Sequence, residues 1–166
     1  WNQIGCDIDG EAAGDQFGHS VSLSKDGRSV AIGGITNDGN GNNAGHVRVF
    51  RLPDITAPTV AVTSDVSSLS AGETATLTFT LSESSTDFTE ADVSITGGSL
   101  SNFSGSGSSY SATFTPDASS DTNEVISIAS GVFADAAGNT NADGSDSNNS
   151  VTLTVDTVSA PPFTRL

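Results

Sequence analysis

The sequence predicts an all-β chain in which a small antiparallel sheet precedes an antiparallel β-sandwich. Short runs of alternating apolar and polar residues are separated by turn residues, which is the pattern of half-buried strands. No segment keeps apolar residues at positions i, i+3 and i+4 over three turns, so we expect no helix. Two prolines, Pro53 and Pro58, interrupt the pattern, and we place a domain boundary after residue 53.

The first segment, residues 1–53, is expected to form a small sheet. Three strands are predicted, at residues 17–23, 28–33 and 46–52. The pair Asp26-Gly27 predicts a hairpin between the first two strands. Residues 1–4 are a candidate fourth strand.

The second segment begins at residue 54 and is expected to form the sandwich. Six strands are predicted, near residues 58–63, 73–82, 91–96, 108–115, 124–130 and 150–156. In the clearest of them, Ala75, Leu77, Phe79 and Leu81 share one face and threonines occupy the other. The same alternation turns a further set inward: Val60, Val62, Val93, Ile95, Tyr110, Ala112, Phe114, Ile126, Ile128, Val151, Leu153 and Val155.

Spaced motifs in the first segment resemble a known repeat. They are Asp7-Ile-Asp9-Gly10-Glu11, Gly14-Asp15-Gln16-Phe17-Gly18, Val30-Ala-Ile-Gly33 and Gly45-His-Val-Arg-Val-Phe50. Together they are similar to one repeat of the FG-GAP type, the blade unit of integrin-like β-propellers in bacterial surface proteins. The resemblance implies a single blade, whereas a full propeller needs about four to eight.

Spaced motifs in the second segment, within residues 54–157, also resemble a known family. They include Phe79-Thr-Leu-Ser-Glu83, Tyr110-Ser-Ala-Thr-Phe114, Phe133-Ala-Asp-Ala-Ala-Gly-Asn139 and Val155-Asp-Thr157. Together they are similar to the bacterial immunoglobulin-like domains that recur in tandem in large secreted and cell-surface proteins. The resemblance implies an immunoglobulin-like β-sandwich and a secreted or bacterial cell-surface location. Residues 158–166 are expected to be a terminal linker or exchange segment.

Charge excludes two classes of partner. Five Lys and Arg against 20 Asp and Glu give a net charge of -15, which repels nucleic acid and anionic lipid surfaces. The excess is concentrated after residue 53, where fourteen acidic residues face only Arg165. No apolar run is long enough to span a membrane.

The sequence offers no catalytic constellation, so we expect no enzyme. His19 and His46 both lie inside alternating strands, and Cys6 has no nearby base. Cys6 is the single cysteine and is expected to be a small buried apolar residue.

We favour calcium binding as the role of the carboxylates, because this hard cation takes six to eight oxygen ligands. In the first segment the candidates are Asp7, Asp9, Glu11 and Asp15, with Asx hydrogen bonds within a turn as the alternative. The loop at residues 37–43 is open to the same two interpretations. In the second segment the resemblance suggests Glu83, Asp135 and Asn139, completed by Asp54 or Asp156 from the linkers. There the alternative is a plain turn with acidic residues that keep the protein in solution.

The leading hypothesis for function is a structural, non-enzymatic building block of a cell-surface stalk or self-assembling filament, stabilised by calcium. A lone blade has apolar residues on both faces and open edges, so it needs cover from other copies or from neighbouring repeats. The expected assembly contacts are Trp1, Ile4, Pro161 and Phe163 in the terminal segments.

The alternative is an adhesin or a carbohydrate-binding or other ligand-binding module of a larger secreted protein. The Thr-x-Thr rows at residues 74–80 and 152–154 are typical of a solvated sheet face; a hydroxyl array for ice or glycans is the second interpretation.

Overall fold

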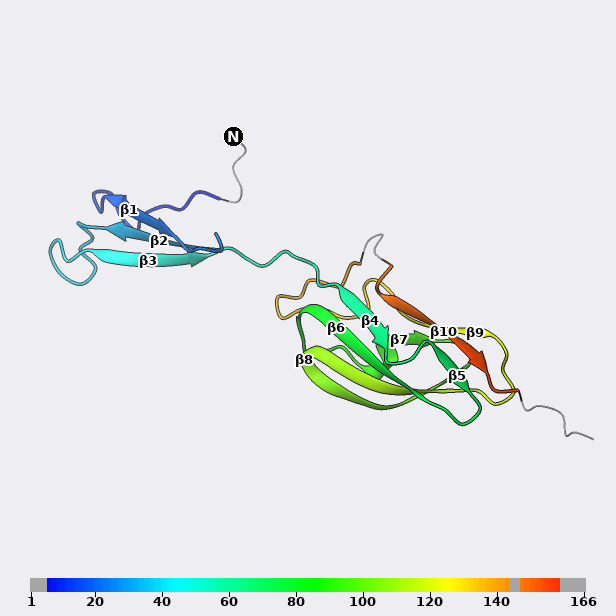
Figure 1. The fold of residues 1–166 in the computed structure, drawn as a ribbon. Coiled ribbons are helices and arrows are strands. Elements are labelled where there is room, and N and C mark those ends of the chain that lie inside the picture. Colours follow the sequence, from blue (N-terminus) through cyan, green and yellow to red (C-terminus); the bar gives the residue numbers. More distant parts are fainter. Residues whose placement is uncertain (1–5, 144–146, 159–166) are drawn as a thin grey trace, which may run out of the picture. The chain divides into compact units, whose positions relative to one another are not determined.

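The computed structural model describes residues 6–143 and 147–158 (Figure 1). The chain folds into two compact units, Trp1–Pro53 and Asp54–Leu166. Apart from one short 3-10 helix, every regular element among the described residues is a β-strand. The all-β prediction is therefore confirmed.

The first unit contains one antiparallel sheet with the strand order β1-β2-β3. Its strands are β1 (Phe17–Leu23), β2 (Ser29–Gly34) and β3 (His46–Arg51). The predicted hairpin joins β1 to β2, and the Asp26 carboxylate closes its turn by accepting the hydroxyl of Ser24 and the N–H of Arg28. Gly27 in this turn has a φ of 72°, a conformation that glycine adopts without steric cost. The candidate fourth strand, residues 1–4, lies outside the described residues.

Both faces of this sheet expose apolar side chains. On one face the guanidinium of Arg48 lies 4.9 Å from the ring centre of Phe50 and 5.7 Å from that of Phe17, which covers part of the surface. The register puts Val21 on the face of Ile32 and Arg48, and Val49 on the opposite face with Ala31. Four side chains remain 63–70% exposed: Val21, Leu23, Val47 and Val49.

The second unit consists of two sheets that pack face to face (Figure 1). One sheet has the order β4-β6-β8, formed by β4 (Val60–Ser64), β6 (Ala75–Ser85) and β8 (Gly98–Pro116). The other has the order β5-β10-β9-β7, formed by β5 (Ser68–Ser70), β10 (Ser150–Asp156), β9 (Asn123–Ile128) and β7 (Val93–Ile95). Helix η1 (Glu90–Asp92) precedes β7. Strand β5 runs parallel to β10, and the other pairs are antiparallel.

The core lies between these sheets and follows the predicted alternation. Ala75, Leu77 and Phe79 of β6 are completely buried, and the threonines between them are exposed. The other residues predicted to point inward are buried too, except that Val93, Ile95 and Val151 are only partly buried. Three buried core residues were not predicted: Leu69, Phe88 and Phe133.

Two further expectations differ from the structure. Strand β8 begins at Gly98 rather than near residue 108, and its first part folds back beside its second part, with the hydroxyls of Ser104 and Ser111 3.5 Å apart. Cys6 is exposed, not buried, because residues 6–16 form no strand that could carry it into a core.

Candidate metal centre

The site in the second unit begins with a tight turn at residues 134–140. Ala134 pairs with Thr140 in an isolated β-bridge. The N–H of Asp135 donates to the carbonyl of Asn139, and the carbonyl of Asp135 accepts the N–H of Gly138. The Asp135 carboxylate accepts the N–H groups of Ala137 at 2.8 Å and of Asn139 at 2.9 Å. These bonds fix the direction in which the carboxylate points.

The side chain of Asn139 also contributes to this geometry. Its amide donates to the second carboxylate oxygen of Asp135 at 2.8 Å and to the main-chain carbonyl of Asp54 at 3.2 Å. The bond from the Asn139 side chain is the largest cause that lowers the pKa of Asp135, and the backbone N–H donors lower it further while burial opposes them. Asp135 is therefore held in its charged form.

Glu83 reaches the site from the last part of β6. The neighbouring Ser85 pairs with Asp135, which ties the end of β6 to the turn. The hydroxyl of Tyr110 donates to the Ser85 carbonyl at 2.9 Å, and the Asp87 carboxylate accepts the N–H of Ala134 at 2.9 Å. The turn and the strand end are thus held together by bonds that do not involve Glu83.

Asp54 completes the group from the first residue of the second unit. Its carboxylate accepts the N–H of Thr56 at 3.1 Å. One ligand atom each from Asp54, Glu83 and Asp135 lie within 4.8 Å of one another. Among residues 6–143 and 147–158 this is the single group of three or more potential metal ligands at such spacing.

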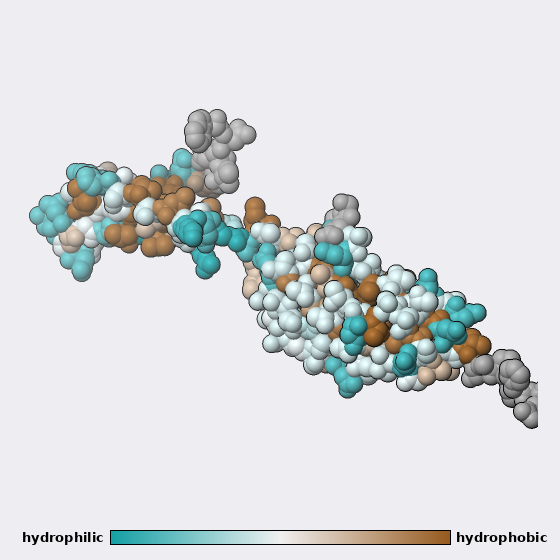
Figure 2. Space-filling view, viewed as in Figure 1, coloured by the Kyte–Doolittle hydropathy of each residue, from teal (hydrophilic) through white to brown (hydrophobic). Residues whose placement is uncertain are grey.

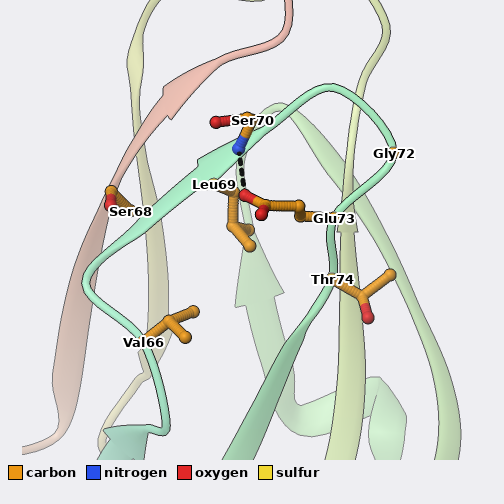
Figure 3. A pocket seen from close by; sticks show the side chains of 7 residues that line it. All are labelled: Val66, Ser68, Leu69, Ser70, Gly72, Glu73 and Thr74. Atoms are coloured by element: carbon orange, nitrogen blue, oxygen red, sulfur yellow. Dashed lines mark hydrogen bonds between the residues drawn. The ribbon is translucent and has the colours of Figure 1, made fainter.

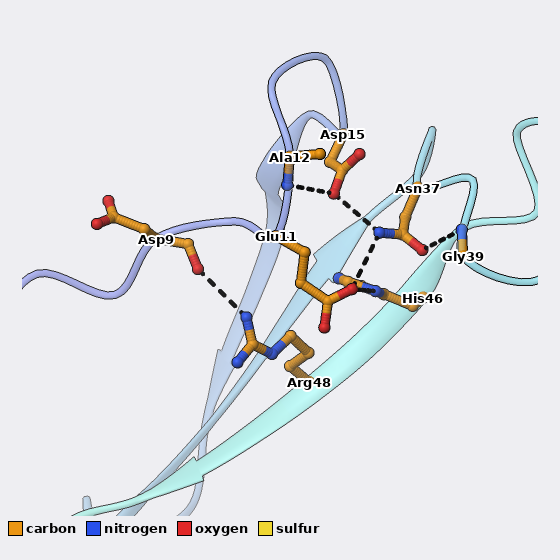
Figure 4. Close-up of polar contacts among 8 residues, drawn as sticks. All are labelled: Asp9, Glu11, Ala12, Asp15, Asn37, Gly39, His46 and Arg48. Atoms are coloured by element: carbon orange, nitrogen blue, oxygen red, sulfur yellow. Dashed lines mark hydrogen bonds and ion pairs between the residues drawn. The ribbon is translucent and has the colours of Figure 1, made fainter.

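The candidate ligands of the first unit are arranged differently (Figure 4). Asp15 is 5% exposed, and its carboxylate accepts the N–H of Ala12 at 3.1 Å and the side-chain amide of Asn37 at 2.8 Å. The same amide donates to Glu11 at 3.3 Å, and Glu11 lies 3.6 Å from Nδ1 of His46. Glu11 and Asp15 are therefore joined through a neutral amide.

The other candidate ligands of the first unit, Asp7 and Asp9, do not form a cluster with Glu11 and Asp15. Asp9 takes part through its main-chain carbonyl, which accepts from Arg48 at 3.3 Å, while its carboxylate points away from Glu11 (Figure 4). In the loop at 37–43, side-chain oxygens of Asn37 and Asp38 accept main-chain N–H groups of Gly39 and Asn43, as in an ordinary turn.

Comparison with known proteins gives a match for each unit. Residues 54–152 match the family model of the bacterial Ig-like domain. The chain belongs to the bacterial Ig-like domain family. Residues 8–50 match the model of the FG-GAP repeat, so both sequence resemblances are confirmed in the stated order. No curated protein and no solved structure matches the chain.

These families describe modules of extracellular or cell-surface proteins, and both are families of non-catalytic domains. No helix among the described residues is long and apolar enough to cross a membrane. A surface depression of the Ig-like domain beside the hairpin from β5 to β6 is shown in Figure 3. Its carboxylate, Glu73, accepts the N–H of Ser70 at 2.8 Å, and no histidine, cysteine or lysine lines it.

Asp54 and Asp156, the two linker residues that the sequence offered as alternative ligands, lie at different ends of the Ig-like domain. Asp54 lies beside Glu83 and Asp135, whereas Asp156 pairs with Ser70 at the end of β10. Ser70 leads into the start of β6 and Glu83 lies near its end, so Asp156 is at the opposite end of the domain. The sequence alone could not distinguish the two residues, because each Asp is followed by a similar turn-forming segment with proline.

The chemistry of the cluster suits a hard cation. Three carboxylates supply oxygen ligands, and water can supply the rest of the six to eight that calcium takes. From residue 54 to residue 164 the sequence contains no Lys, Arg or His, so no side chain of that segment can neutralise the cluster. The donor set therefore fits calcium.

Proposed function

We propose that the protein is a structural, non-enzymatic module of an extracellular or cell-surface protein, a building block of a surface stalk or self-assembling filament, and that calcium stabilises its Ig-like domain. The observation that carries this proposal is the cluster of Asp54, Glu83 and Asp135. It joins the first residue of the domain to β6 and to the 134–140 turn. A cation held there would fix the point at which the preceding segment enters the domain.

Calcium would stabilise this domain for an electrostatic reason. Three neighbouring carboxylates repel one another, and a bound divalent cation converts that repulsion into attraction. A ligand that binds the folded but not the unfolded chain stabilises by mass action, by about 2.7 kcal/mol at a concentration 100-fold above Kd. Extracellular modules bind calcium with Kd values of roughly 0.1–1 mM, so millimolar calcium is the relevant range.

The test is thermal unfolding of the chain in millimolar calcium and in chelator. We expect calcium to raise Tm for the wild type and to have a much smaller effect on Glu83→Gln, which removes one charge from the cluster. Glu90→Gln is the matched control, because Glu90 is exposed on η1 and outside the cluster. A Tm that does not depend on calcium, or an equal calcium effect in both variants, would refute calcium stabilisation.

The assembly part of the proposal is supported by the small sheet of the first unit. Its exposed valines and leucine lie on both faces, so covering one face with a second blade leaves the other face available for a third. We propose that other copies, or neighbouring repeats of a longer chain, supply this cover. The terminal residues expected to assist, Trp1, Ile4, Pro161 and Phe163, lie outside the described residues.

Sedimentation velocity over a range of concentrations tests assembly. We expect larger species for the wild type, and a shift toward monomer for Val49→Lys, which places a charge on a side chain that is 70% exposed on the blade. Val125→Lys is the control, at a half-exposed valine of the Ig-like domain. A wild-type chain that stays monomeric at high concentration would contradict self-assembly and leave only tandem repeats in one chain.

A further inference from the structure

The outer face of the sheet β4-β6-β8 is a regular array of hydroxyl groups. Register pairs Thr63 of β4 with Thr78 of β6, and Thr78 with Ser111 of β8. A second row contains Thr76 and Thr113. Neighbouring strands are about 4.8 Å apart and alternate residues about 6.8 Å apart, so the hydroxyls form a two-dimensional grid.

The first part of β8 extends this grid by one more strand. The hydroxyls of Ser104 and Ser111 are 3.5 Å apart, and the side-chain amide of Asn102 donates to the hydroxyl of Thr113 at 3.4 Å. In Figure 2 the surface over β6 and β8 is largely pale, as expected for serine and threonine, with few strongly hydrophilic groups. The array is therefore broad as well as regular.

The absence of charge on these rows is the unusual feature. The segment from residue 54 onward carries fourteen acidic residues and one basic residue, yet none of the grid positions is ionisable. The surface of a soluble designed domain is given about 25–35% charged residues. The acidic residues closest in the sequence, Asp65, Glu73 and Glu83, lie at the strand ends. The Asp65 carboxylate accepts the N–H of Thr76 at 2.7 Å, and that of Glu73 accepts the N–H of Ser70 at 2.8 Å.

We infer that this face, the grid of Thr63, Thr76, Thr78, Thr80, Ser111 and Thr113, binds an uncharged polysaccharide along its length. A hydroxyl is both donor and acceptor, so the grid can meet sugar hydroxyls in either orientation. An anionic polymer would be repelled by the domain's charge. The hot spots of protein–protein interfaces are enriched in Trp, Tyr and Arg, and the grid has none of these residues.

The contacts must act together to give useful binding. A hydrogen bond exchanged with water contributes only about 0.5–1.5 kcal/mol net, so one sugar residue would bind weakly. Repeated contacts along a polymer raise the overall affinity by multivalency. We therefore expect binding to an extended insoluble polymer and little binding to its short soluble fragments. The inference does not rest on the calcium proposal, because the grid lacks a metal ligand.

The experiment measures depletion of the full chain from solution by microcrystalline cellulose and by chitin, with alginate beads as an anionic comparison. The test variant is Thr78→Glu, at the centre of the grid. The matched control is Thr152→Glu, an exposed threonine of β10 in the opposite sheet. Thermal unfolding of both variants verifies that they fold.

We expect the wild type and Thr152→Glu to bind at least one uncharged polymer, and Thr78→Glu to bind it at least about tenfold more weakly, equivalent to about 1.4 kcal/mol. Glu83→Gln should bind as the wild type does, which separates this inference from the calcium site. No binding of the wild type, equal loss in both threonine variants, or equal binding to alginate would overturn the inference. So would self-association of the wild type that Thr78→Glu abolishes, because the face would then be covered by another copy.

Discussion

The side-chain amide of Asn139 bridges two parts of the candidate metal centre, donating to the carboxylate of Asp135 at 2.8 Å and to the carbonyl of Asp54 at 3.2 Å. Asn139 itself is not one of the clustered carboxylates. Its role is to hold the turn against the first residue of the domain, so that the carboxylates stay close in spite of their mutual repulsion. An amide can do this because it carries donors and no charge.

Asn139→Ala should therefore destabilise the domain. Two hydrogen bonds are lost, one of them to a charged acceptor, and we expect a decrease of about 1–3 kcal/mol in the free energy of unfolding. Urea denaturation of the variant measures it. Asn123→Ala, at an exposed position of β9, is the control and should change stability by less than about 0.5 kcal/mol. Equal effects of the two substitutions would show that the bridge does not contribute.

Stability should fall in acid. Hydrogen bonds lower the folded-state pKa of Asp135, chiefly from Asn139, that of Asp87, chiefly from the N–H of Ala134, and that of Glu124, chiefly from Thr122. The unfolded chain then takes up protons at a higher pH than the folded chain does. The stabilisation is present above the ordinary carboxyl pKa values and is lost as the pH falls below about 5 through the folded values.

Glu124 is a suitable residue for testing this dependence. It is 3% exposed, and its carboxylate accepts the hydroxyls of Thr122 at 2.8 Å and Ser120 at 3.0 Å. Glu124→Gln keeps the shape and removes the titrating group, so its stability should depend less steeply on pH than that of the wild type between about pH 5 and 3. Urea denaturation at several pH values provides the comparison. A wild type and variant with parallel pH profiles would contradict the role of this carboxylate.

Prediction from sequence succeeded where periodicity carried the information. In β6 the alternation is uninterrupted, so the buried set of Leu77, Phe79 and Leu81 followed directly. Phe88 and Phe133 were missed because they lie in irregular segments, where no period indicates which side chain turns inward. Strand β5 was missed because it has only three residues, with Leu69 as its single apolar one.

For the candidate site too, the sequence predicted some of the residues but not how contacts between distant segments arrange them. Glu83, Asp135 and Asn139 were expected from the family resemblance, and the structure places them together with Asp54. The position of Asp156 at the far end of the domain depends on its pairing with Ser70, a contact between segments far apart in the sequence. The serine- and glycine-rich first part of β8 lacks any alternation that would mark it as a strand.

A side chain at Gly97 should push the Glu124 carboxylate away from its hydroxyl donors, Ser120 and Thr122. A Cβ on Gly97 would lie 2.0 Å from the carboxylate of Glu124, and the φ of Gly97 is +51°. Gly97→Ala combines a steric clash with an unfavourable backbone conformation and should cost about 2–4 kcal/mol. Gly72→Ala is the matched control, because Gly72 also has a positive φ, +83°, but has open space around it. We expect the control to cost about 1 kcal/mol, the cost of the left-handed backbone alone. Urea denaturation of both variants then separates the clash from the backbone strain.

Phe88 should be one of the most sensitive residues of the core. It is 4% exposed, and its ring centre lies 5.0 Å from that of Tyr110 and 5.1 Å from that of Phe133, with both pairs nearly edge to face. Phe88→Ala would leave a cavity among these rings, and we expect a loss of about 3–5 kcal/mol in the free energy of unfolding. Phe88→Leu should cost less, because it refills part of the volume. Urea denaturation would contradict the packing argument if Phe88→Ala cost no more than Val66→Ala, a truncation of a valine that is 39% exposed.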